Sequence, residues 1–117
     1  MTKAAISIVL AGDLVLDEPD APHWLAGIAP AVQGADLAVG HLEVPHTARG
    51  DELKGDVPAP GAPPENVAAI AGAGFHLLSL AGNHMADCGA DGIADTLALL
   101  AKAGLQGTGA GLTLTEA

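Results

Sequence analysis

Three short apolar runs dominate this 117-residue chain, and each is long enough for a strand but short for a helix. They are rich in Ala, Val, Leu and Ile and occupy residues 4–12, 36–43 and 75–82. Such runs are typical of parallel strands buried on both faces of a sheet. Helical patterns follow them at residues 21–35 (divided by Pro30), 63–74 and 90–104. With a fourth strand expected within residues 105–111, this alternation predicts an α/β fold with a mainly parallel sheet and flanking helices.

Only two large rings are available for the core, Trp24 and Phe75, because aromatic residues make up 2% of the chain. We therefore expect a core of small and branched aliphatic side chains in closely packed elements, which the 16 glycines permit. Residues 44–64 hold five of the eight prolines and three glycines. Because this density opposes regular elements, we expect a long, irregular and mobile loop there.

The formal net charge of -10 argues against two classes of partner. Four Lys and Arg residues cannot neutralise a nucleic acid or dock on an anionic membrane. No stretch approaches the ~20 apolar residues that span a bilayer, and no signal peptide is clear, so we expect a cytoplasmic protein. Cys88 is the single cysteine, which excludes an internal disulfide, and we interpret it as a packing residue rather than a nucleophile.

Polar side chains follow each apolar run at the point where a strand should end. Asp13 follows the first run, His41 and Glu43 end the second, and Asn83 and His84 follow the third. Because the carboxyl ends of parallel strands meet at one edge of a sheet, we expect these residues to lie together. Carboxylate and amide oxygens suit Mg, Mn or Ca, and a nearby imidazole suits Zn or Fe as well.

His84 has the chemistry of a proton-transfer group, since an imidazole can act as acid or base near neutral pH. Asp87 lies three residues further on and could orient the ring. Taken singly, each polar residue also has an ordinary interpretation. Asp13 could cap a turn, Glu43 could be a solvated loop acid, and His41 could be a ligand or simply a partner of Glu43. The coincidence of three clusters at three strand ends favours a functional site.

The motifs resemble those of capsule-synthesis proteins of the poly-γ-glutamate (CapA) type, a family related to calcineurin-like metallophosphatases. The resemblance rests on "GDLVL" from Gly12, "HLEVP" from His41 and the long stretch at residues 73–111. In that family, Gly-Asp follows the first strand, Asn-Leu-Glu-x-Pro the second and Asn-Asn-His-x-x-Asp-x-Gly the third. The resemblance implies a metallophosphatase-like α/β sandwich, of which residues 1–117 form a single domain, the N-terminal half.

The resemblance also implies roles for individual residues. Asp13 and Asn83 would be metal ligands, and Glu43 would take the position of a bridging acid. His84 would stabilise the transition state or transfer a proton rather than bind metal, with Asp87 as its partner. The ion would be divalent: Mn, Mg, Ca, Zn or Fe.

Three positions depart from the family pattern. His41 and Gly82 replace asparagines, and Val15 stands where metallophosphatases usually have a histidine. No histidine follows His84 in this chain, although such folds take further ligands from a second half. We therefore expect the site to be completed by a missing C-terminal half or a second chain.

The function that the resemblance implies is a metal-dependent hydrolase or transferase of capsule polymer (poly-γ-glutamate) synthesis. Its substrate would be a peptide, polyglutamate or a phosphate-containing compound. Two alternatives remain open from the sequence. One is a peptide epimerase on the same scaffold, and the other is a non-catalytic fragment that binds a partner through an exposed half-sheet.

Overall fold

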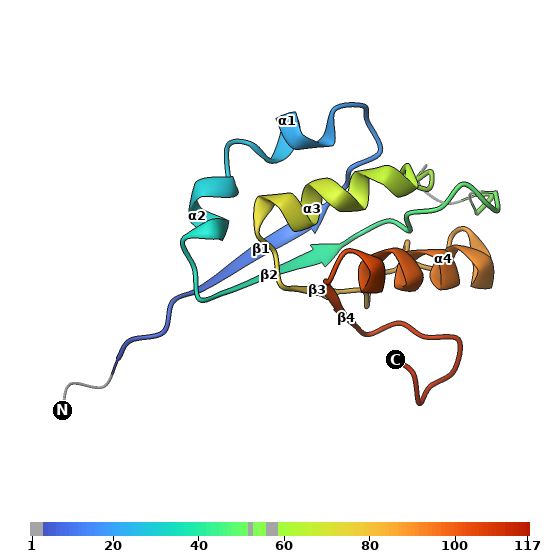
Figure 1. Cartoon of the computed structure of the whole chain (residues 1–117). Helices are drawn as coiled ribbons and strands as arrows, with labels where there is room; N and C mark the ends of the chain where they lie inside the picture. Colours follow the sequence, from blue (N-terminus) through green and yellow to red (C-terminus); the bar gives the residue numbers. More distant parts are fainter. Residues whose placement is uncertain (1–3, 52, 56–58) are drawn as a thin grey trace.

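A four-stranded sheet, parallel throughout, forms the centre of the computed structural model, which describes residues 4–51, 53–55 and 59–117 (Figure 1). The strands are adjacent in chain order: β1 (Ile8–Leu14), β2 (Leu37–Leu42), β3 (Leu77–Ser79) and β4 (Gln106–Thr108). The helical elements are α1 (Ala21–Leu25), α2 (Ala29–Gln33), the 3₁₀ turn η1 (Pro64–Asn66), α3 (Val67–Ala73) and α4 (Gly89–Lys102). The predicted α/β fold with a parallel sheet and flanking helices is confirmed.

Proline and glycine set the ends of the helices, as the sequence predicts. Residues 21–35 form two short helices, and each has a proline in its first turn. A proline is tolerated there because its missing N–H would have no helical partner. Gly74 ends α3 in a left-handed conformation with φ 98°, and an added Cβ would lie 2.9 Å from the Gln33 side chain. A glycine is therefore required at this turn.

The helices of the described residues cover one face of the sheet. Gly40, Leu78 and Gly107 are aligned on neighbouring strands, so they share a face. A Cβ on Gly40 would contact Phe75, and one on Gly107 would contact Leu100 of α4. Sequential parallel strands joined by right-handed crossovers place every connecting helix on the same side. The main core therefore lies between this face and the helices.

The opposite face of the sheet is apolar, and no helix of the described residues lies over it. Five aligned side chains define this open face: Ile8, Leu10, Leu37, Val39 and Leu77. Ile8 is 56% exposed and Leu10 is 77% exposed. The expectation that the first strand is buried on both faces is therefore wrong. β1 is an edge strand, and only the side facing the helices packs into the core.

Residues 44–64 are irregular, as predicted, although residues 52 and 56–58 lie outside the described part. Residues 44–47 are buried, and His46 forms an isolated parallel bridge with Ala62. Thr96 of α4 accepts a hydrogen bond at its Oγ1 from the His46 backbone N–H (2.9 Å). Arg49 forms a two-pronged ion pair with Asp95 of α4, with N–O distances of 2.6 and 2.9 Å. The loop is thus joined to α4 by polar contacts. The mobility of the loop stays a prediction.

The His46 side chain is fully buried, and neither ring nitrogen has a well-aligned hydrogen-bond partner among the described residues. Burial lowers the pKa of this ring from 6.5 to about 4, against a smaller opposing effect of the Val44 backbone. The neutral ring is therefore the form that the fold accepts. At Asp95, the hydrogen bonds from Arg49 and then Thr47 lower the carboxyl pKa to about 2.

None of the helices in the described ranges is both long and apolar enough to cross a bilayer.

Replacing Leu78 by alanine should destabilise the fold by about 2–5 kcal/mol, because this fully buried side chain of β3 would leave a cavity. Leu10→Ala on the open face is the matched control and should change stability by no more than about 0.5 kcal/mol. Urea unfolding of both variants measures the difference. Equal losses would contradict the one-sided core.

Acid should weaken the fold through His46. Between pH 6.5 and about 4 the unfolded ring takes up a proton while the buried ring does not, so stability falls as the pH falls. The contribution is complete above pH 6.5, and its full loss is about 3 kcal/mol. Urea unfolding at pH 7.5 and pH 5 should show the loss in the natural protein and a smaller one in His46→Leu. His23→Gln, at an exposed position, should leave the dependence of the unfolding free energy on pH as it is in the natural protein. If His46→Leu also leaves that dependence unchanged, His46 is not the group responsible.

Candidate metal site

A β-bulge near the end of β1 decides where Asp13 lies. Leu10 is aligned with Val39, but the next aligned pair is Asp13 with His41, so β1 has one more residue than β2 in this interval. Side chains alternate between the two faces of a regular strand, which would put residue 13 on the side opposite Leu10. At the bulge, two residues of β1 take the place of one, so the alternation is interrupted once. Asp13 therefore lies on the same side as Leu10, which is the open face.

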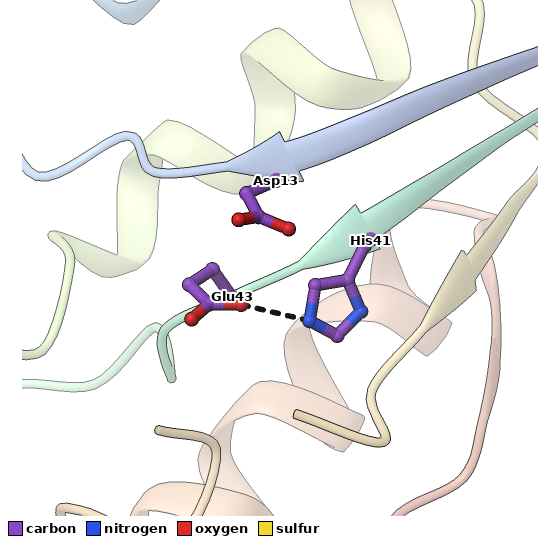
Figure 2. A group of neighbouring side chains, drawn as sticks. All are labelled: Asp13, His41 and Glu43. Carbon is purple, nitrogen blue, oxygen red and sulfur yellow. Dashed lines mark hydrogen bonds and ion pairs between the residues drawn. The ribbon is translucent and has the colours of Figure 1, made fainter. Parts of the chain in front are cut away.

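Three side chains meet at the carboxyl edge of this face. Asp13 comes from β1, His41 from β2 and Glu43 from the residues directly after β2 (Figure 2). One potential ligand atom from each lies within 4.8 Å of the other two. His41 Nε2 is 2.8 Å from Glu43 Oε2, and the two side chains are 23% and 18% exposed. The structure thus brings together three of the four residues predicted to bind metal.

The donor set fits a divalent ion. Ligand bonds of about 2.0–2.2 Å allow donor atoms on one ion to lie up to about 4.3 Å apart, so only small side-chain movements are needed. Two carboxylates and one imidazole are ligands for Mn, Fe or Zn, whereas Mg and Ca prefer oxygen alone. The carboxylate positions also supply the negative charge that would offset a dication. Ligand roles for these residues stay predictions.

Asn83, the fourth predicted ligand, is exposed in the turn after β3. Its neighbours in the chain both approach the cluster. A Cβ on Gly82 would lie 2.6 Å from His41 Nε2, and His84 lines a cavity together with Asp13 and Glu43. The position of Asn83 is therefore adjacent to the site, and its role as a ligand stays a prediction.

His84 and Asp87 form a close pair beside this cluster. His84 Nδ1 is 2.7 Å from Asp87 Oδ2, and the side chains are 12% and 3% exposed. The Asp87 backbone N–H also donates to the His84 carbonyl at 3.0 Å, which fixes the turn between them. A buried carboxylate on one ring nitrogen orients the imidazole, as expected from their three-residue spacing.

A cavity of about 250 Å³ joins the two groups. Its lining contains Asp13, Glu43 and His84 together with Asp17 and Val15. Sequence reasoning missed Asp17, although its position four residues after Asp13 in the same strand-end segment could have indicated it. Val15 is 47% exposed, and it gives this part of the cavity an apolar side chain at one of the positions that depart from the family pattern.

Comparisons with known proteins agree with the motifs. Residues 7–117 match the family described as bacterial capsule synthesis protein PGA_cap. The chain is also 37% identical over 98 residues to probable polyglutamine synthesis accessory proteins of two Mycobacterium tuberculosis strains, CDC 1551 / Oshkosh and ATCC 25618 / H37Rv. These alignments cover 81% of this chain and 26% of each relative, so the chain spans about a quarter of their length. The predicted family is confirmed: the chain belongs to the bacterial capsule synthesis proteins.

Proposed function

We propose that this chain carries the metal-binding part of a metal-dependent hydrolase or transferase that acts in capsule polymer synthesis. The observation that carries the proposal is the convergence of Asp13, His41 and Glu43 on one face of the sheet, within 4.8 Å. Asp13 and His41 come from different strands, and the cluster that they form with Glu43 lies beside a cavity. The names of the relatives, which are accessory proteins of polyglutamine synthesis, support the capsule association.

A bound divalent ion would polarise a substrate oxygen and lower the pKa of a water molecule. The residues around it would have separate tasks. Asp13, His41 and Glu43 would hold the ion, with Asn83 as a further oxygen donor. His84 lines the cavity beside them, and its bond to Asp87 keeps the ring oriented for moving a proton.

The charge of the cavity supports a metal-dependent interaction with an anionic substrate. Three carboxyl side chains line it, from Asp13, Asp17 and Glu43. These carboxylates would repel polyglutamate or a phosphate group in the absence of a cation. We therefore propose a peptide, polyglutamate or phosphate-containing substrate that binds only when the ion is present.

Removing a ligand and removing the proton-transfer group should have different effects. Asp13→Ala should lower Mn²⁺ or Zn²⁺ affinity by at least about 100-fold, because it removes an anionic ligand. His84→Ala should retain most of the metal but lower turnover by about 10²- to 10⁴-fold in the full protein that the gene encodes. Asp87→Asn should retain metal and lose less activity, because it only loosens the imidazole. Calorimetric titration gives the affinity, and turnover is followed as phosphate release or amide cleavage.

Two outcomes would contradict these roles. If His84→Ala loses metal as fully as Asp13→Ala, then His84 is a ligand rather than a proton-transfer group. If the full protein binds neither ion, the proposed function fails. Incorporation of solvent deuterium into a peptide, without cleavage, would instead identify the reaction as epimerisation.

The open face favours a second candidate, in which the chain also acts by binding a protein partner. Exposed Ile8 and Leu10 continue directly into the cluster at Asp13 and His41 on the same face. Contiguous apolar surface of this kind marks sites of protein association. We propose that this face packs against an apolar layer from further sequence of a longer protein or from a second chain, which would complete the site.

Association through the open face predicts a specific effect of charge. The isolated 117-residue chain should self-associate as its concentration rises, and Leu10→Lys should suppress this because it buries a charge at the contact. Leu114→Lys is the control, since Leu114 is 96% exposed but lies outside the sheet. Sedimentation velocity measures both. If Leu10→Lys and Leu114→Lys suppress self-association equally, the open face is not the surface through which the chain associates.

A further inference from the structure

Gly82 lies directly against the His41 imidazole at the turn after β3. We infer that Gly82 is a positioning residue of the metal site, because the absence of its side chain creates the space in which His41 lies. The inference rests on the proposed metal site and assigns that site a residue that binds no metal itself.

With the His41 ring in its present position, the distances leave no room for a side chain at residue 82. An added Cβ would lie 2.6 Å from His41 Nε2 and 2.9 Å from Cε1, both closer than real Cβ contacts. It would also lie 3.4 Å from Glu43 Oε2. Gly82 is not among the glycines with a left-handed backbone. Space around the imidazole, rather than backbone conformation, therefore requires glycine here.

His41 has little freedom to avoid such a Cβ. Its backbone belongs to β2, which pairs with β1 on one side and β3 on the other, where His41 is aligned with Asp13 and Ser79. The ring could turn away only by rotating about its side-chain bonds, which would move Nε2 from its position 2.8 Å from Glu43 Oε2. We expect the donor atoms to converge less closely after this movement.

A shift of the turn would also disturb the site. The Gly82 carbonyl accepts a hydrogen bond from the Met85 backbone N–H at 3.4 Å, and Met85 is buried in the core. His84 lies between these two residues and lines the cavity with Asp13. A larger residue at position 82 would therefore displace either the imidazole of His41 or the turn that carries His84.

The test compares Gly82→Ala with Gly27→Ala, His41→Ala and the double variant. At Gly27 no described atom lies within 4 Å of an added Cβ, so this control makes the same chemical change without a contact. Two measurements are made: calorimetric affinity for Mn²⁺ and Zn²⁺, and the imidazole Cε1–H NMR signals of the metal-free chain. His76 is the internal NMR reference, because its Nδ1 accepts a separate hydrogen bond from the Ala38 backbone.

Gly82→Ala should weaken metal binding by at least about 10-fold, and Gly27→Ala by less than about twofold. The His41 signal should shift in Gly82→Ala while the His76 signal does not. Once His41→Ala has removed the ring, adding Gly82→Ala should cause no further loss of affinity. If Gly82→Ala fails to fold, the double variant should fold again, because the obstructing ring is gone.

Natural metal affinity together with an unshifted His41 signal in Gly82→Ala would overturn the inference. An equal loss of metal affinity from Gly82→Ala in the natural chain and in the His41→Ala variant would also overturn it. If Gly82→Ala does not fold, a double variant that also fails to fold would overturn it as well. If the full protein binds neither ion, the proposed function fails separately. The NMR comparison then decides only whether Gly82 positions the His41 ring: a shifted His41 signal supports this, and an unshifted one overturns it.

Discussion

The candidate site depends on the hydrogen-bond register between the first three strands. Pairing of β2 with both neighbours brings the ends of β1 and β3 to the same edge, so residues far apart in the chain meet there. The register is held from the other side of the sheet by Ala38, Leu42 and Leu78, whose side chains are fully buried under the helices. A slip of one residue would exchange the two faces of a strand, which would expose these apolar side chains. Core packing and the geometry of the site are therefore specified together.

The sequence predicted the order of strands and helices because local signals determine it. Proline at helix starts, glycine at helix ends and short aliphatic runs each act within a few residues. It also predicted the neighbourhood of Asp13, His41 and Glu43, because parallel strand ends must share an edge. These inferences needed the direction of the strands but no knowledge of side-chain packing.

Other features depend on contacts that no local pattern reports. Leu10 is exposed because nothing in the described part of the chain packs over its side of the sheet, although the strand has the composition of a buried one. Burial of His46 depends on how its loop packs on Thr96 of α4. The contact between Gly82 and His41 joins two strand ends and becomes visible only in three dimensions. Asp17 likewise lines a cavity that only the folded arrangement of these segments creates.

The bulge in β1 makes this part of the strand tolerant of a change in length as well as of a change in side chain. Gly12 has no described atom within 4 Å of an added Cβ, so its side-chain space is open. Losing one residue between Leu10 and Asp13 would leave them two positions apart, which is the separation of Val39 and His41 in β2. Regular alternation would then keep the carboxylate on the open face beside His41, and no charged group would have to enter the core. A one-codon deletion at the bulge would therefore give a regular strand that still presents Asp13 to the site, whereas a deletion within a regular part of the strand would turn its side chains to the other face.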